Sequence, residues 1–193
     1  MDAPSRKAVF LDRDGTIIAD KDYLDSADKI EFIPGAASAL KRLHQSGFLI
    51  VVISNQSGVA RGFFSESRCR EINDTLEEIL SGQGVPLSGG IYYCPHLPGA
   101  KVPEYDKKCE CRKPAPGLFL KAAGEHSIDF KKSWAVGDSL RDLEPAANLG
   151  AATILVLTGK GRSQASEENA ARWVGHIAED LSGAADIILG NIS

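Results

Sequence analysis

Short apolar segments alternate along the chain with stretches in which apolar residues recur every three or four positions. The short segments are rich in branched side chains, which favour strands, and the longer stretches have the spacing of one helix face. The predicted strands cover residues 8–11, 48–53, 91–93, 134–136 and 153–157, with 186–189 as a closing edge strand. The predicted helices cover residues 37–43, 72–80, 118–123 and 143–149.

This alternation of strands and helices indicates an α/β fold. A strand, a helix and a second strand form a βαβ unit, in which the two strands run parallel. We therefore expect a Rossmann-like, doubly wound, mainly parallel sheet with helices on both faces. No linker or repeat divides the chain, so a single domain over residues 1–193 is expected. Too few residues separate the predicted elements for a large cap domain, and ligands of such folds bind at the carboxyl ends of the strands.

Composition narrows the range of partners. Hydrophobic residues make up 43% of the chain and charged residues 25%, as in ordinary globular proteins. The net charge of −4 argues against nucleic-acid binding, which usually needs a clustered basic face. The chain start lacks a signal-peptide pattern and no apolar run is long enough for a bilayer, so we expect a cytoplasmic protein without membrane contact. Nothing in the sequence requires a dimer, and a monomer acting on a small metabolite is expected.

Two aspartates follow the first predicted strand. Asp12 and Asp14 stand two positions apart, and Gly15 makes a turn sterically easy there. Both can then reach one Mg²⁺, a hard cation that binds through a few carboxylates and substrate phosphate. In that arrangement Asp12 can attack phosphorus, while Asp14 protonates the leaving alkoxide and later takes a proton from water. The alternative is an acidic turn that only ends the strand.

Further polar groups follow predicted strands or precede predicted helices. Ser54 and the residues after it offer a hydroxyl, an amide and backbone N–H groups to phosphate oxygens. Lys113, beside Arg112, offers a compact positive charge. Asp138 and Asp142 offer a third acidic metal ligand. Taken singly, each group has a structural alternative: a polar turn for Ser54, a pair of cations at the start of a helix for Arg112 and Lys113, and a helix N-cap for the aspartates. Together and in this order, they indicate phosphate chemistry.

The combined motifs resemble those of the haloacid dehalogenase superfamily of phosphotransferases. The matching positions are Asp12-Arg13-Asp14-Gly15-Thr16, Ser54, Lys113, and Gly137-Asp138 with Asp142. The resemblance extends from the first predicted strand to about residue 161. It implies that Asp12 is the nucleophile and Asp14 the general acid and base, with Ser54 and Lys113 holding the phosphoryl group. It also implies a Mg²⁺ site formed by Asp12, the backbone carbonyl of Asp14, and Asp138.

One long connection carries three of the four cysteines. Cys94 and His96 stand at its start, and Cys109 and Cys111 stand near its end. Three thiols and an imidazole suit the closed tetrahedral site of a structural Zn²⁺ ion. The Cys-x-His and Cys-x-Cys spacings are shorter than the commoner ones, and four unrelated polar or buried residues are the alternative. Cys69 lies apart in a predicted helix and is expected to be a core thiol. The sequence thus predicts a zinc-binding loop that ends beside the cationic pair.

The same loop narrows the resemblance. Residues 55–62 and 109–114 resemble the branch that contains D-glycero-D-manno-heptose 1,7-bisphosphate phosphatases and histidinol-phosphate phosphatases. By that resemblance, the substrate pocket is lined by Asp20, Lys21, Asp22, Tyr23, Ser54, Asn55, Gln56, Ser57, Arg112, Lys113, and Arg141 or its neighbours. Arg61 is a candidate contact for a second phosphate, with a merely solvated arginine as the alternative. The chain differs from the family pattern at two positions. Ile18 stands where many heptose enzymes have asparagine, and Ser54 stands where they have threonine, which keeps the hydroxyl group.

The resemblance favours one reaction and leaves alternatives. The favoured reaction removes the C7 phosphate of a heptose 1,7-bisphosphate through an aspartyl-phosphate. It belongs to carbohydrate metabolism that leads to lipopolysaccharide or to a nucleotide-activated heptose. Hydrolysis of histidinol phosphate is the second candidate, which the acidic residues Asp20, Asp22 and Asp25 keep open. A zinc-stabilised binding module without turnover is the third, although none of the four motifs is missing. A nucleic-acid 3′-phosphatase is disfavoured by the acidic charge balance.

Overall fold

One parallel sheet forms the centre of the structure, a computed structural model that describes residues 5–191. Its strands are β1 (Ala8–Leu11), β2 (Leu49–Asn55), β3 (Ile91–Cys94), β4 (Trp134–Gly137), β5 (Ala152–Val156) and β6 (His176–Ala178). They lie in the order β3-β2-β1-β4-β5-β6, and every neighbouring pair is parallel. The predicted fold class is therefore confirmed, and the first five predicted strands differ from the observed ones only at their ends.

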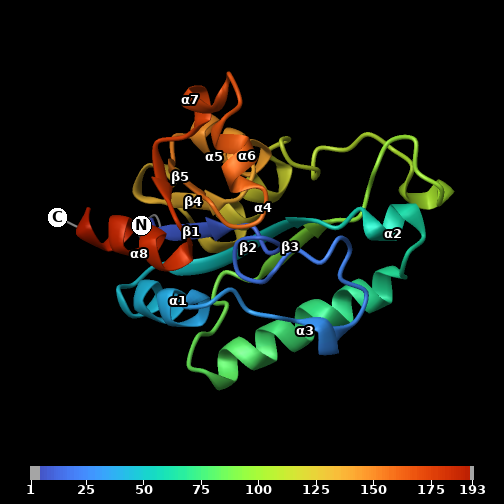
Figure 1. Cartoon of the computed structure of the whole chain (residues 1–193), viewed down its shortest axis with the longest axis horizontal. Coiled ribbons are helices and arrows are strands. Elements are labelled where there is room, and N and C mark those ends of the chain that lie inside the picture. The colour runs from blue at the N-terminus through green and yellow to red at the C-terminus, as the bar shows by residue number, and fades with distance from the viewer. Residues whose placement is uncertain (1–4, 192–193) are drawn as a thin grey trace.

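Helices cover both faces of this sheet (Figure 1). The helices are α1 (Ala36–Gln45), α2 (Gly58–Arg61), α3 (Glu66–Gly82), α4 (Gly117–His126), α5 (Leu140–Asn148), α6 (Gly161–Ala165), α7 (Ala170–Trp173) and α8 (Leu181–Gly190). Short 3-10 helices are η1 (Ala27–Lys29), η2 (Pro103–Tyr105) and η3 (Phe130–Lys132). One apolar cluster joins the sheet to α1, α3 and α8, and a second joins it to α4 and α5.

Strand β2 shows why the central strands are apolar throughout. Ile50 and Val52 belong to the cluster with α1, α3 and α8, whereas Val51 and Ile53 belong to the cluster with α4 and α5. Successive side chains of a strand point to opposite faces, so a strand between two helical layers buries all of them. All four are at most 1% exposed. The continuous apolar run therefore reflects burial on both faces.

The closing strand predicted from the sequence is wrong. Residues 186–189 lie in α8, in which Ile188 is fully buried. The helix is capped by Asp180, whose side chain accepts a hydrogen bond from the Gly183 N–H at 2.9 Å. The edge strand is β6 instead, and its central Ile177 is 52% exposed. A four-residue apolar run has no readable period, and only packing of the whole segment distinguishes a helix from a strand.

The strand order places a crevice between β1 and β4. The chain runs from β1 to α1 on one face of the sheet, and from β4 to α5 on the other. Because the chain leaves these neighbouring strands in opposite directions, the sheet opens at their carboxyl ends. Asp12 directly follows β1, and Asp138 directly follows β4. The fold therefore brings two of the predicted acidic residues to one crevice.

Loops, and not an inserted cap domain, surround this end of the sheet. The long connections are residues 12–35, between β1 and α1, and residues 95–116, between β3 and α4. Each is far too short for a large cap, as the sequence predicted.

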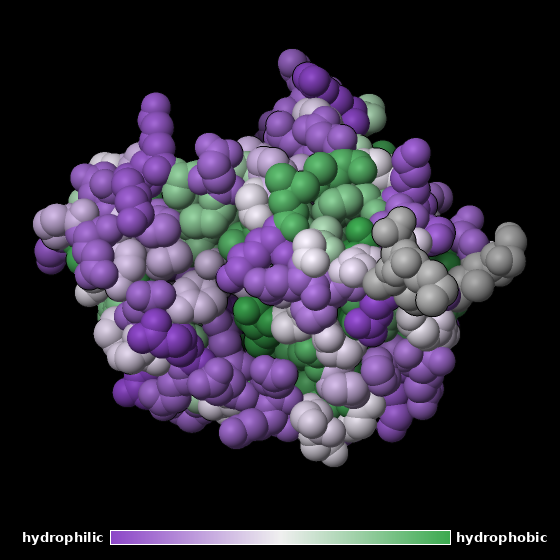
Figure 2. Space-filling model, turned by 180° about the vertical axis from the view of Figure 1, so that it is seen from behind, coloured by the Kyte–Doolittle hydropathy of each residue, from purple (hydrophilic) through white to green (hydrophobic). Residues whose placement is uncertain are grey.

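The face of the molecule that Figure 2 shows is mainly hydrophilic. From behind, apolar side chains appear in separate patches among polar ones (Figure 2). The large hydrophobic side chains that are exposed, such as Phe63 and Leu120, lie on different elements. Within residues 5–191, no helix combines the length and the apolar character that crossing a membrane requires.

The packing of α3 gives a prediction about stability. Leu76 is fully buried between α3 and the sheet, so Leu76→Ala should lower the free energy of unfolding by about 2–5 kcal/mol in urea denaturation. Leu120 in α4 is 49% exposed, and Leu120→Ala should change it by only about 0.5 kcal/mol. Similar losses for the two variants would contradict the described packing.

Candidate active site and cysteine cluster

Asp12 and Lys113 form a buried ion pair at the end of β1. The Asp12 backbone N–H donates to the carbonyl of Val136 in β4 at 3.1 Å, which fixes the residue over the crevice. The Lys113 side chain is 2% exposed. Its Nζ contacts Asp12 Oδ1 at 2.8 Å, Asp142 Oδ1 at 2.7 Å and the Ile53 carbonyl oxygen at 2.5 Å. A lysine ammonium has three protons, so these three acceptors satisfy it.

Three carboxylates meet beside this ammonium. Oxygens of Asp12, Asp138 and Asp142 all lie within 4.8 Å of one another. Burial raises the pKa of Asp12 to about 8, against the attraction of Lys113 and with the help of the neighbouring carboxylates. Burial and the charge of Asp142 also raise the pKa of Asp138, to about 6. Crowded carboxylates of this kind favour a cation, and an all-oxygen donor set fits a hard ion such as Mg²⁺.

Two glycines leave the space that Asp138 occupies. A Cβ on Gly15 would lie 2.2 Å from Asp138 Oδ2, and a Cβ on Gly159 would lie 2.0 Å from the same oxygen. The φ of Gly15 is +84°, a conformation that side chains rarely adopt. The backbone N–H of Lys160 donates to Asp138 Oδ2 at 2.8 Å. The Asp138 carboxylate is thus held by a tight cradle of backbone.

Asp142 links Lys113 to the start of α5. Its Oδ2 accepts a hydrogen bond from the Ser139 N–H at 3.1 Å, and the Ser139 side chain caps the helix in return. Its Oδ1 is the oxygen that pairs with Lys113. One buried carboxylate therefore stabilises the helix end and neutralises the ammonium.

The Asp14 side chain is bonded to protein groups and does not join the three crowded carboxylates. Its oxygens accept hydrogen bonds from Arg13 Nε and Nη2, both at 3.1 Å, and from Gln56 Nε2 at 2.8 Å. It still lines the same pocket as Asp12. The expected Mg²⁺ contact of Asp14 is through its backbone carbonyl, and this contact stays a prediction.

Residues at the end of β2 support the site from the other side. The Ser54 hydroxyl is buried and accepts a hydrogen bond from Gln56 Nε2 at 2.6 Å. Asn55 makes a reciprocal pair with the Lys113 backbone, at 3.0 Å to its N–H and 3.1 Å to its carbonyl. Asn55 therefore holds the chain segment on which Lys113 lies, which its sequence position alone did not indicate.

A polar pocket opens over these groups. Its lining consists of Asp12, Asp14, Asp20, Tyr23, Leu24, Asn55, Lys113, Asp138, Arg141, Asp142 and Lys160. Lys160 was not among the residues predicted from the sequence, and its Nζ pairs with Asp20 at 2.9 Å. The polar turn that follows β5 could have indicated Lys160, because all the parallel strands end at this edge of the sheet.

The other predicted substrate residues lie outside the pocket lining. They are Lys21, Asp22, Ser54, Gln56, Ser57, Arg61 and Arg112. Lys21 forms an ion pair with Glu31 on the surface. The Arg61 guanidinium lies 5.6 Å from the centre of the Tyr23 ring, at the rim. Arg112 donates to the His96 carbonyl at 3.1 Å and lines a neighbouring hollow with Lys113.

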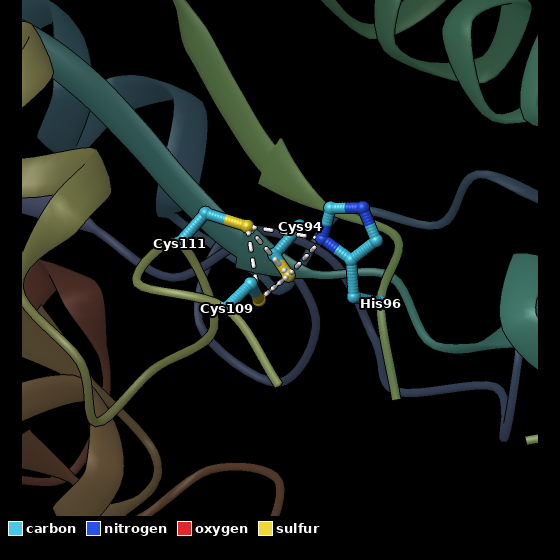
Figure 3. A group of neighbouring side chains, drawn as sticks. All are labelled: Cys94, His96, Cys109 and Cys111. Carbon is cyan, nitrogen blue, oxygen red and sulfur yellow. Dashed lines mark hydrogen bonds between the residues drawn. The ribbon is translucent and has the colours of Figure 1, made fainter. Parts of the chain in front are cut away.

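Cys94, His96, Cys109 and Cys111 converge in one cluster (Figure 3). The Cys111 Sγ lies 3.1 Å from that of Cys94, 3.2 Å from that of Cys109 and 3.2 Å from His96 Nδ1. Cys94 Sγ lies 3.6 Å from Cys109 Sγ and 3.7 Å from His96 Nδ1. Three thiol sulfurs and one imidazole nitrogen that face one point match the ligand set of a structural zinc site. Cys69 is buried in α3, where desolvation raises the pKa of its thiol to about 11.

The chain is similar to known proteins over most of its length. A family model for HAD-hydrolase-like proteins matches residues 110–184. The chain is 44% identical over 181 residues to the D-glycero-beta-D-manno-heptose-1,7-bisphosphate 7-phosphatase of Escherichia coli (strain K12), covering 93% of each protein. It is 43% identical over 176 residues to the protein of the same name from Yersinia pestis, covering 90% of this chain and 92% of that protein.

A solved structure agrees with these sequence matches. The crystal structure of D,D-heptose 1,7-bisphosphate phosphatase from B. bronchiseptica, complexed with magnesium and phosphate, superposes with a TM-score of 0.85 at 36% sequence identity. The match covers 96% of this chain and 99% of that chain.

The crowded carboxylates predict a pH-dependent response to Mg²⁺. Without metal, the raised pKa values of Asp12 and Asp138 mean that the folded protein binds protons that the unfolded chain releases above an ordinary aspartate pKa of 3.8. This contribution to stability is complete below about pH 4 and is lost as the pH rises to about 8. Mg²⁺ binds the ionised carboxylates, so its stabilising effect should increase over the same range.

Thermal unfolding at about pH 5.5 and about pH 8, with and without Mg²⁺, measures this effect. At about 100 times its Kd, Mg²⁺ should add about 2.7 kcal/mol of stability at the higher pH. Asp138→Asn should lose most of that gain. A larger gain at the lower pH would contradict the assignment of the carboxylates.

Proposed function

The chain belongs to the heptose-bisphosphate phosphatase branch of the haloacid dehalogenase superfamily, and from this membership we propose that it hydrolyses the C7 phosphate of D-glycero-β-D-manno-heptose 1,7-bisphosphate. Identity of 44% over 93% of the chain to a curated enzyme supports this substrate. The single structural observation that carries the proposal is the contact of Lys113 with Asp12 beside Asp138. An ammonium and a bound cation together allow a carboxylate to approach a phosphate dianion, which it otherwise repels.

Asp12 is the proposed nucleophile. When bound at Asp12, Asp138 and the Asp14 carbonyl, Mg²⁺ supplies positive charge to the phosphoryl oxygens. The Asp12 oxygen forms a bond to phosphorus while the bond from phosphorus to the C7 oxygen breaks. Lys113 keeps the carboxylate oriented and its ammonium neutralises charge on the phosphoryl group. The result is an aspartyl-phosphate and the free sugar alcohol.

Asp14 is the proposed general acid and base. It gives its proton to the C7 oxygen as that oxygen leaves, and it is then ionised. In the second step it takes a proton from the water that attacks the aspartyl-phosphate, which regenerates Asp12 and releases inorganic phosphate. Its position in the lining of the pocket that also contains Asp12 supports this role.

Three arginines support recognition of the second phosphate. Burial lowers the pKa of Arg112, and repulsion from Arg141 and Arg61 lowers it further, so both of these side chains act electrostatically on Arg112. Within residues 5–191, none of the three forms an ion pair with a carboxylate. Like charges gathered at the rim of an active site favour an anionic ligand. We assign them to the C1 phosphate, which histidinol phosphate lacks.

The cysteine cluster is the proposed zinc site. Cys94 ends β3, and the other three members lie in the connection that carries Arg112 and Lys113, so a metal there would order the segment that carries both cations. The proposed location is the cytoplasm, where cysteines stay reduced and remain available as metal ligands. The proposed role of the zinc is structural, since the four side chains fill a tetrahedral ligand set.

Replacement of the nucleophile tests the mechanism. Asp12→Asn should lower kcat for heptose 1,7-bisphosphate by at least about 10⁴-fold while the fold stays intact by circular dichroism. Asp74→Asn, the same change on the exposed face of α3, should keep full activity. Substantial turnover by the Asp12 variant would remove Asp12 as the nucleophile.

Phosphate release from both anomers of heptose 1,7-bisphosphate and from histidinol phosphate tests the substrate. We expect the β anomer to have the highest kcat/KM. Preference for histidinol phosphate would overturn the substrate and the assignment of the arginines, but not the catalytic residues. Absence of release from all three would favour a binding protein with this fold.

Zinc analysis tests the cysteine cluster. The purified protein should hold about one zinc ion per chain, and Cys109→Ser should lose the metal and unfold at a lower temperature. Cys69→Ala removes a thiol outside the cluster and should keep the zinc. Equal zinc content in the two variants would refute the site.

A further inference from the structure

Arg13 is a charged side chain with no access to water. It stands between Asp12 and Asp14 in the sequence and is 1% exposed, the largest of the fully buried side chains. It does not line the active-site pocket. Burial of a guanidinium is costly unless its N–H groups are bonded and its charge is paired. A buried arginine at this position therefore needs an explanation from its partners.

The partners of Arg13 converge on Asp14. Arg13 Nε donates to Asp14 Oδ2 and Arg13 Nη2 donates to Asp14 Oδ1, both at 3.1 Å. These two parallel bonds form the fork that a planar guanidinium makes with a carboxylate. Such a fork fixes the plane of the carboxylate as well as its distance, which a lysine at this position could not do.

The guanidinium is itself fixed from two other elements. Arg13 Nη1 donates to Asn73 Oδ1 in α3 at 2.8 Å, and Nη2 also donates to Gln56 Oε1 after β2 at 3.0 Å. Asn73 is 6% exposed and Gln56 is 5% exposed, so neither bond competes with bulk water. Gln56 also donates to Asp14 Oδ2 at 2.8 Å and to the Ser54 hydroxyl at 2.6 Å.

We propose that Arg13, anchored by Asn73 and Gln56, is a positioning residue that aims the Asp14 carboxyl group at the oxygen of the leaving alkoxide. The proposal rests on the proposed phosphatase reaction, in which Asp14 is the acid. Proton transfer needs donor and acceptor within about 2.6–3.2 Å, and a misplacement of about 1 Å costs about 10²-fold in rate. A carboxylate held by only one bond rotates about its side-chain torsions, whereas the fork removes that freedom.

The dependence of the rate on the leaving group distinguishes a misplaced general acid from a general loss of activity caused by a disturbed structure. An alkoxide must be protonated as it leaves, but p-nitrophenolate leaves without a proton. The ratio kcat/KM covers only the steps up to departure of the leaving group, so later hydrolysis of the aspartyl-phosphate does not affect it. We therefore compare kcat/KM for heptose 1,7-bisphosphate and a simple alkyl phosphate with that for p-nitrophenyl phosphate.

Arg13→Met keeps an unbranched side chain and removes the guanidinium with its fork. It should lower kcat/KM for both alkyl substrates by about 10²-fold, the lower end of the contribution of a general acid, and that for p-nitrophenyl phosphate by less than about 5-fold. Arg13→Lys keeps the charge without the fork and should show the same pattern. Leu76→Ala is the control, because it lowers stability from the same helix as Asn73 but leaves the hydrogen bonds of Arg13 in place. It should change kcat/KM for all substrates by the same factor.

Asn73→Leu tests the proposal should Arg13→Met fail to fold. It removes one anchor of the guanidinium and keeps the Arg13–Asp14 pair, so it should show the same substrate pattern with a smaller loss. Equal losses on alkyl and aryl substrates in the folded variants, or no loss on either, would overturn the role of Arg13. Failure of the unchanged enzyme to hydrolyse heptose 1,7-bisphosphate would instead refute the proposed substrate, because the simple alkyl phosphate still measures the effect of Arg13.

Discussion

Neutralisation of the buried Lys113 ammonium is the interaction on which the site depends. Carboxylates from the ends of β1 and the start of α5 provide two acceptors, and the Ile53 carbonyl provides the third. Burial lowers the pKa of the lysine, but Asp12 and Asp142 more than offset this, and its pKa is raised. Loss of both carboxylates would leave the ammonium uncompensated in the interior, and breaking a buried pair in this way costs about 3–5 kcal/mol. The nucleophile, the phosphate-binding cation and the cap of α5 are therefore one unit.

A site without a cap domain has to form its walls from loops, and these loops are tied together. The Val102 N–H donates to the Ala60 carbonyl at 3.0 Å, which joins the cysteine-bearing connection to α2. The Glu66 carboxylate accepts hydrogen bonds from the hydroxyl groups of Tyr93 and Tyr105, both at 2.9 Å. The cysteine cluster holds the other side of the same connection. The segments that carry Arg61 and Arg112 are thus tied to their neighbours without a second domain.

The elements and site residues that could be predicted are those marked by a pattern within a short stretch of sequence. Apolar runs between polar turns identified the central strands, and Asp12, Asp138 and Ser54 could be proposed because each lies at or just after the end of a strand. Residues 186–189 were predicted wrongly as a strand, because their periodicity appears only with the buried residues that precede them in α8. Lys160 was missed because a single lysine in a turn resembles a solvated one. Its pairing with Asp20 spans 140 positions and is visible only in the fold.

The class of reaction could be inferred from the residues alone, because two aspartates, a serine and a lysine at or near strand ends suit few other tasks. The sequence also determined the parallel sheet, because apolar runs with no polar face require helices on both sides. The fold was needed to show which carboxylate oxygens face one another, and that the Asp14 carboxylate is bonded to the buried Arg13. Such contacts depend on the balance of desolvation and pairing for charges brought together from distant segments, and a linear pattern contains no distances between those segments.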